Sequence, residues 1–211
     1  MSQVKKGVST LIFTPNRLEA LTDGIFAIVM TLLVLDLSIT GISQSSVQAE
    51  LPRRLFESWP AFLAYVMSFI ILGMIWISHH RMFHYIKRSN PMLMWINIIF
   101  LMFVALVPFS TRLMGDYLWT QVPFVIYGIN LILIFITRLA LWNYASGKSH
   151  LVDSSIKPLV IKRVKLFIGI VPTIMFLVIV GVSFINIIAG YVVLWLLLPY
   201  GFLAQRLTGG E

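Results

Sequence analysis

The sequence predicts an all-α integral membrane protein with six transmembrane helices per subunit. Its 211 residues are 59% hydrophobic and only 11% charged, whereas an ordinary soluble domain is about 45–50% apolar and about 25% charged. So few charged side chains cannot solvate a soluble globule, and a disordered chain or a coiled coil needs more charge still. Uncharged runs of span length and a one-sided distribution of lysine and arginine indicate the same class.

The first predicted span, residues 18–39, differs from the others because it holds acidic residues. Glu19 and Asp23 lie near one end, and Asp36 lies near the other. The preceding segment, residues 1–16, has two lysines but no long apolar core followed by small residues. We therefore expect no removable signal peptide, so the first apolar stretch is expected to remain as a span.

Three spans without formal charge follow, and the remaining apolar sequence forms one long run. From Leu166 to Gln205 the chain has 40 consecutive uncharged residues, twice the roughly 20 residues with which one helix crosses about 30 Å of hydrocarbon. This run must fold back on itself, and Asn186 near its middle predicts a tight helical hairpin. The chain is read as a single domain, residues 1–211, with spans at 18–39, 59–80, 91–111, 117–137, 166–185 and 187–205.

The positive charges test this span count independently. With six spans, both termini and the second and fourth connections lie on one side, and all but Arg53, Arg54 and Arg112 of the 16 lysines and arginines fall there. Because cytoplasmic loops collect lysine and arginine, both termini are predicted to be cytoplasmic. The residues on that side are Lys5, Lys6, Arg17, Arg81, Lys87, Arg88, Arg138, Lys148, Lys157, Lys162, Arg163, Lys165 and Arg206.

The sequence gives no support for an enzyme or a metal centre. It has no cysteine, no Ser-His-Asp spacing, no glycine-rich phosphate loop and no pair of acids at a working separation. His80 and His84 share a helical face, but no carboxylate or thiolate completes a metal-binding set. The net charge of +8 is explained by the cytoplasmic membrane side rather than by nucleic acid, so we expect neither a nucleic-acid partner nor a cofactor.

Ionisable residues near the ends of the first two spans are the first candidates for function, because such groups are costly inside a membrane. The cytoplasmic ends of these spans are neighbours in the predicted topology, so Asp23 is expected to meet His79 or His80, and Arg17 to join them. Two interpretations stay open: the cluster clamps two helices together, or it relays protons in a secondary transporter. A helix-bundle scaffold without transport is a third class.

One face of the first span is an aliphatic stripe. At 100° per residue, Ile28, Leu32 and Leu35 cluster within about 40° of one line, and Thr31 lies about 60° from it. Asp23 points roughly 140° away, toward the rest of the subunit. Any face of a lipid-exposed helix can be aliphatic, so this periodicity alone does not make a pore.

The residues of the first three spans resemble a known channel family. The run Arg17-Leu-Glu-Ala-Leu-Thr-Asp23-Gly24, followed by Ile28, Thr31 and Leu32, resembles the Arg-x-x-x-Phe-Ser-Asp signature of the endolysosomal transmembrane potassium channel family. The run from Trp76 to His80 and the stretch from Asn97 to Ser110 are similar to that family as well. The resemblance covers the whole chain, with Leu21 where phenylalanine is usual and Thr22 where serine is usual.

The resemblance implies a passive, moderately potassium-selective cation channel in a homotetramer, without a carbonyl filter. It implies that the first helices line a central pore, with Ile28, Leu32 and Leu35 as the constriction and Thr31 as an adjacent hydroxyl layer. Potassium and other monovalent cations would be the permeant ions and the lipid bilayer the surroundings. Prokaryotic members of the family are single six-helix units of about this length. The resemblance therefore implies a multi-pass protein of a prokaryotic cell membrane.

The resemblance also assigns a structural polar network that does not touch the ion. Its residues would hold the first helix against the second, and they are Arg17, Thr22, Asp23, Trp76 and either His79 or His80. The alternative function, a proton-coupled secondary transporter, would use the same Asp23 with His79 or His80.

Overall fold

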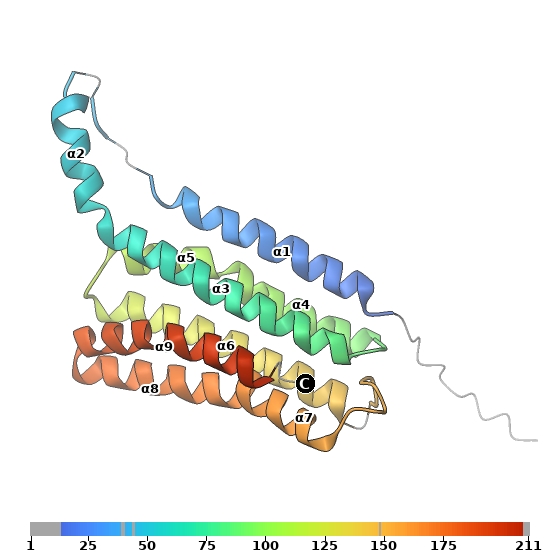
Figure 1. The fold of residues 1–211 in the computed structure, drawn as a ribbon. Coiled ribbons are helices and arrows are strands. Elements are labelled where there is room, and N and C mark those ends of the chain that lie inside the picture. The colour runs from blue at the N-terminus through green and yellow to red at the C-terminus, as the bar shows by residue number, and fades with distance from the viewer. Residues whose placement is uncertain (1–13, 39–40, 44, 148, 209–211) are drawn as a thin grey trace, which may run out of the picture.

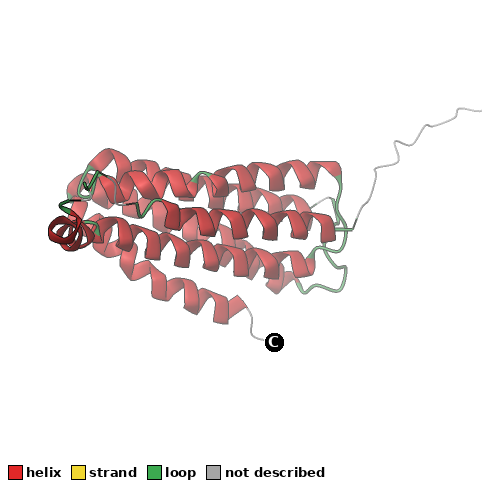
Figure 2. Ribbon diagram, turned by 90° about the horizontal axis from the view of Figure 1, so that it is seen from above, coloured by secondary structure: helices red, strands yellow, loops and turns green. Residues whose placement is uncertain are grey.

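The computed structural model describes residues 14–38, 41–43, 45–147 and 149–208, with side chains as far as residue 199. Within these residues the chain is an elongated bundle of helices running side by side (Figures 1 and 2). The elements are α1 (Asn16–Leu35), α2 (Val47–Glu57), α3 (Trp59–Tyr85), α4 (Pro91–Ala105), α5 (Val107–Asp116), α6 (Gln121–Ser146), α7 (Pro158–Val164), the π-helical η1 (Lys165–Ile170), α8 (Val171–Ile185) and α9 (Ile187–Thr208).

Five helical segments of the described chain are long and apolar enough to cross a membrane. They are α1, α3, the pair α4–α5, α6, and the continuous segment from α7 to α8. The sixth predicted span corresponds to α9, whose apolar part Ile187–Pro199 is shorter. The prediction of an all-helical membrane protein is thereby confirmed in its coarse form.

Two membrane segments are interrupted where proline removes a backbone donor. The third span divides at Leu106, two residues before Pro108, into α4 and α5. In the fifth, η1 precedes Pro172, and the Thr173 hydroxyl donates to the Gly169 carbonyl at 2.7 Å. Proline cannot donate to the preceding turn, so a shift of hydrogen-bond register or a side-chain donor satisfies the freed carbonyls.

The second and fourth connections lie together at one end of the bundle. Ile86 and Val152 form an antiparallel bridge between them, and the Arg88 guanidinium donates to the His150 carbonyl at 2.7 Å. The first, third and fifth connections lie at the opposite end (Figure 1). Asp153, in the fourth connection, accepts hydrogen bonds from the backbone and hydroxyl of Ser155, which lower the pKa of its carboxyl group.

The structure differs from the sequence prediction in the first connection. Val47–Glu57 forms the exposed helix α2 in the connection between the first two predicted spans, for which no helix was predicted. The helix is too short to span a membrane and carries charges, so a search for apolar spans could not find it. It extends away from the bundle in Figure 1 and adjoins α3 through Ser58.

A second correction concerns Arg138, which we placed in a cytoplasmic loop. The helix α6 begins at Gln121 and continues to Ser146, and Arg138 inside it is only 1% exposed. Trp119 adopts a positive φ of 65°, which precludes an earlier helix start, and no glycine or proline lies between Thr137, the predicted end, and Gly147. The remaining loop cations therefore carry the charge difference between the two sides, and of these Lys5, Lys6 and Lys148 lie outside the described residues.

Candidate pore-lining helix and its polar anchors

The inner face of α1 packs against α3, α4 and α5 at one edge of the bundle. The buried residues of this face repeat every three or four positions, as helix geometry requires of a single face. They are Leu18, Thr22, Phe26, Val29 and Leu33. Inside a bilayer, van der Waals packing of these side chains and interhelical hydrogen bonds, rather than removal of apolar surface from water, hold α1 against its neighbours.

The opposite face of α1 is the stripe that the helical wheel singled out, and within the subunit nothing covers it. Ile28 is 56% exposed, Leu32 41% and Leu35 68%, and Thr31 is exposed beside them. The Thr31 hydroxyl donates to the Ile28 carbonyl of its own helix at 2.7 Å. The proton of this hydroxyl is thus engaged inside the helix, and the oxygen lone pairs remain available on the exposed face.

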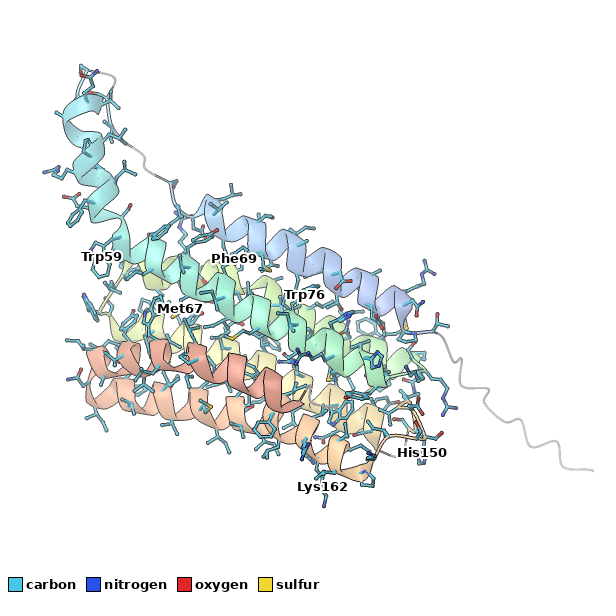
Figure 3. All side chains as sticks on the ribbon, viewed as in Figure 1. Trp59, Met67, Phe69, Trp76, His150 and Lys162 are labelled. Carbon is cyan, nitrogen blue, oxygen red and sulfur yellow. The ribbon has the colours of Figure 1, made fainter. Side chains whose placement is uncertain are left out.

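Three polar contacts anchor α1 to its three neighbouring helices. The Trp76 indole on α3 donates to the Asp23 carboxylate at 2.8 Å, and Trp76 lies between α1 and α3 in Figure 3. The Asn97 amide on α4 donates to the Thr22 hydroxyl at 3.2 Å in a buried site. At the other end of α1, Asp36 lies 4.0 Å from the Arg112 guanidinium on α5, a partly exposed ion pair worth at most about 1 kcal/mol.

The two histidines occupy different surroundings, and neither is hydrogen-bonded to Asp23. His80 is exposed and stacks on Trp76, the partner of Asp23, with ring centroids 6.2 Å apart. His79 is buried and stacks on Phe100 of α4 at 4.6 Å with an interplanar angle of 5°. The expected contact between Asp23 and a histidine is replaced by a hydrogen bond from the Trp76 indole nitrogen, which lies 2.8 Å from the carboxylate. The two imidazole rings stack on other aromatic side chains instead.

Arg17 is exposed at the first turn of α1. Within the described part of the chain it forms no ion pair with Asp23. The structure thus brings together Asp23, Trp76 and His80, joins Thr22 to Asn97, and leaves Arg17 on the surface.

Two polar residues of this region were missed by the search along the sequence. Asn97 bonds Thr22, and its position in an otherwise uncharged apolar stretch was the available signal. Arg138 donates to the Ser78 hydroxyl at 2.6 Å and lies 5.9 Å from the ring centre of Phe135. The sequence placed Arg138 one residue beyond a predicted span, and only the tertiary structure reveals its burial.

The described residues hold no cluster of three or more metal-ligating side chains. His84, the other candidate on the face of His80, lies near the end of α3 beside Tyr85. The stripe of Ile28, Thr31, Leu32 and Leu35 itself offers only aliphatic surface and one hydroxyl oxygen.

A family model for the endosomal/lysosomal potassium channel TMEM175 matches residues 17–108, which include α1 and its anchors on α3 and α4. A potassium channel of Streptomyces collinus is 34% identical over 142 residues, covering 65% of this chain and 68% of that protein. A potassium channel of Chryseobacterium is 39% identical over 131 residues, covering 62% of this chain and 64% of that protein. The vertebrate relatives are longer: the proton channel TMEM175 of Bos taurus is 37% identical over 100 residues, and this chain covers 21% of it.

Solved structures extend the similarity to the fold. The crystal structure of a lysosomal potassium-selective channel TMEM175 homolog from Chamaesiphon minutus has a TM-score of 0.78 at 29% identity, covering 90% of this chain and 97% of that one. The potassium channel MtTMEM175, solved as a variant bound to a nanobody fusion, shares the fold with a TM-score of 0.59 at 17% identity and coverage of 99% and 100%. The anchored first helix, the sequence matches and the common fold together show that this chain belongs to the TMEM175 channel family.

Proposed function

We propose that this chain forms a potassium-permeable channel whose pore is lined by α1. The observation that carries the proposal is the division of α1 into two faces. One face is buried and joined by polar contacts to α3, α4 and α5, whereas the stripe of Ile28, Leu32 and Leu35 is left uncovered. The bacterial relatives are named potassium channels, which supports potassium as the permeant ion.

The pore requires several copies of the chain, because one helix cannot enclose a channel. A closed symmetric assembly would bring the stripes of neighbouring subunits face to face around a central axis. We propose a homotetramer, in which the aliphatic surface of each α1 is covered by the pore and by its symmetry mates.

Aliphatic rings on the pore axis would control conduction through hydration. A ring too narrow for a hydrated ion excludes water and blocks the pore, and a slightly wider one passes the cation that sheds water most easily. Potassium sheds water more easily than sodium, so the proposed channel prefers potassium moderately. The oxygen of Thr31, whose proton is held by the Ile28 carbonyl, would replace part of the lost hydration.

We propose six spans with both termini in the cytoplasm of a prokaryotic cell. The placement of the second and fourth connections at one end of the bundle supports this topology. These connections and the adjoining helix ends carry Arg81, Lys87, Arg88, Lys157, Lys162, Arg163 and Lys165. The described arginines near the opposite end are Arg53, Arg54 and Arg112, which supports a cytoplasmic location for the more basic end.

The polar network of Thr22, Asp23 and Trp76 would hold α1 at a fixed distance from the pore axis. His80 would support Trp76 by stacking, and His79 would fill the space between α3 and α4. Arg17 would act at the membrane surface. A proton-coupled transporter would need Asp23 bonded to an imidazole, whereas its carboxylate accepts from an indole that does not titrate.

Cysteine accessibility tests the pore assignment cleanly, because the chain has no native cysteine. A cationic methanethiosulfonate reagent is applied to channels carrying Leu35→Cys or Leu32→Cys in planar bilayers. Modification places a charge on the proposed pore surface, so the potassium current should fall irreversibly.

Two variants serve as matched controls. Leu33→Cys lies on the buried face of the same helix, and Ile136→Cys lies on an exposed surface of α6. Neither current should change. Block of the control variants with no effect at Leu32 and Leu35 would show that α1 does not line the pore.

A further inference from the structure

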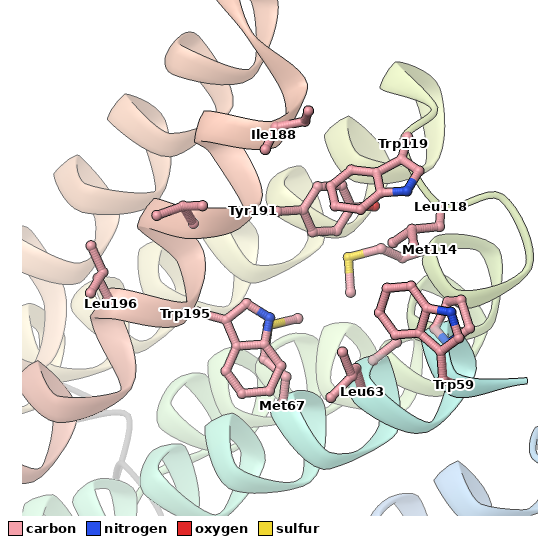
Figure 4. A pocket seen from close by; sticks show the side chains of 13 residues that line it. Trp59, Leu63, Met67, Met114, Leu118, Trp119, Ile188, Tyr191, Trp195 and Leu196 are labelled. Atoms are coloured by element: carbon pink, nitrogen blue, oxygen red, sulfur yellow. The ribbon is translucent and has the colours of Figure 1, made fainter. Parts of the chain in front are cut away.

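A cavity of about 410 Å³ lies between α3, α5 and α9 (Figure 4). It is located at the end of the bundle where α2 joins α3 and where the α8–α9 hairpin turns. Its lining is almost wholly apolar and includes Trp59, Leu63, Met114, Trp119, Val192 and Trp195. The volume falls within the roughly 300–1,000 Å³ of small-molecule sites, and the cavity shares no residue with the exposed stripe of α1.

One wall of the cavity is held in place at a conformational cost. Trp119 adopts φ of 65°, a left-handed conformation that bulky residues rarely take and that costs about 1 kcal/mol or more. Its ring packs edge-on against Tyr191 of α9 at 5.1 Å, and Tyr191 packs in turn against Phe124 at 4.7 Å. The wall is therefore formed before any ligand arrives.

We propose that this cavity binds one acyl chain of an anionic phospholipid. A water molecule in this cavity would find almost no hydrogen-bond partner, and cavities of this kind bind apolar ligands instead. The lining helices α3 and α9 belong to the apolar membrane-embedded part of the chain, so lipid hydrocarbon is the apolar molecule present at highest concentration around the opening. The proposal rests on this membrane placement and not on the pore assignment.

An arginine at this end of the molecule favours a lipid with an anionic headgroup. Trp59 and Trp119 mark the level of the membrane interface, as tryptophans at span ends do. Arg54 lies in the last turn of α2, which Ser58 separates from Trp59 at the start of α3. Its side chain forms no ion pair within the described chain. Arg53, by contrast, is paired with Glu57 at 3.6 Å. An arginine without an ion-pair partner among the described residues, close in sequence to a residue that lines the cavity, favours an anionic headgroup at the interface.

The test measures quenching of tryptophan fluorescence by phosphatidylglycerol that carries bromine on its acyl chain. The full-length protein is reconstituted in phosphatidylcholine, and small fractions of the brominated lipid are added. Quenching should saturate at a low fraction of the lipid. Val192→Phe fills the cavity without adding a tryptophan and should abolish the saturable component. Val178→Phe, at a similarly exposed position on α8, should leave it intact.

A second arm tests the headgroup. Arg54→Gln should lower the preference for brominated phosphatidylglycerol over brominated phosphatidylcholine by about fivefold, as expected for about 1 kcal/mol per interfacial arginine. The proposal is overturned if quenching never saturates, or if Val192→Phe and Val178→Phe behave alike. It is also overturned if Val192→Phe dissociates the oligomer, because a second copy would then be the occupant. The experiment measures lipid binding and not ion flux, so its result can be interpreted even if the protein does not conduct potassium.

Discussion

At the scale of single residues, α1 packs apolar side chains and three polar contacts against its neighbours, and the stripe of Ile28, Leu32 and Leu35 stays uncovered. Asp23 is the residue on which the channel and the transporter hypotheses differ most. As a carboxylate bonded to the Trp76 indole, it supports a structural role, whereas a relay would need a titrating partner.

Replacing Asp23 distinguishes these roles. Asp23→Asn keeps an oxygen that can accept from Trp76, so conduction should persist and stability should fall by no more than about 1–2 kcal/mol. Trp76→Phe removes the donor from a charged acceptor and should cost about 1.5–3 kcal/mol, seen as a lower midpoint of thermal unfolding in detergent. Abolished flux in Asp23→Asn, together with loss of all dependence on a proton gradient, would favour the transporter.

The buried Arg138 gives a second prediction at this scale. Its guanidinium donates to the Ser78 hydroxyl, so Ser78→Ala should destabilise the protein by about 1.5–3 kcal/mol by leaving a buried charged donor unpaired. Ser146→Ala is the control, because the Ser146 hydroxyl bonds only to the Trp142 carbonyl of its own helix. Equal unfolding midpoints for the two variants would contradict this account of Arg138.

At the scale of elements, helix positions could be predicted wherever the signal was apolar length. The hairpin at Asn186 is present as the break between α8 and α9, because 40 uncharged residues allow no other solution in a bilayer. The helix α2 and the burial of Arg138 could not be predicted in this way. The first is set by an amphipathic pattern in a charged connection. The second is set by the packing of α6 among α4, α5 and α8, with the Ser78 hydroxyl of α3 within hydrogen-bond distance of Arg138.

The candidate site was predictable in part for the same reason. Helix geometry identified the stripe of Ile28, Leu32 and Leu35 from the sequence, and the structure leaves those side chains exposed. The partner of Asp23 was not predictable, because His79, His80 and Trp76 lie within five residues of one another and small rotations of α3 decide which side chain reaches the carboxylate.

Close packing of α3 against α5 supplies a prediction at the element scale. A methyl group on Gly115 would lie 2.9 Å from the Cα atom of Ala61, a backbone atom that cannot move without its helix. Gly115→Ala should therefore destabilise the protein by about 1–3 kcal/mol through overpacking. Gly181→Ala on α8 meets nothing within 4 Å and should be neutral or stabilising. Chemical unfolding of both variants in the same detergent makes the comparison, and a stable Gly115→Ala would mean that α3 and α5 are farther apart.

At the scale of the whole molecule, the rest of the described chain leaves the stripe of Ile28, Leu32 and Leu35 on α1 uncovered. Assembly is therefore part of the proposed function. Mass photometry in detergent should give the mass of a tetramer. A cysteine pair across the axis, such as Leu35→Cys in every subunit, should form disulfide-linked dimers under mild oxidation, whereas Ile136→Cys should not. A monomer that conducts potassium would refute the shared pore.

The central claim is that this chain conducts potassium through a passive pore, and the reversal potential tests it most directly. Purified protein in a planar bilayer is measured with potassium on one side and sodium on the other. We predict a current whose reversal potential is displaced from zero toward the potassium equilibrium potential, by less than for an ideally selective pore. A current that reverses at zero under this gradient would contradict the selectivity, and a bilayer that stays silent would contradict the channel.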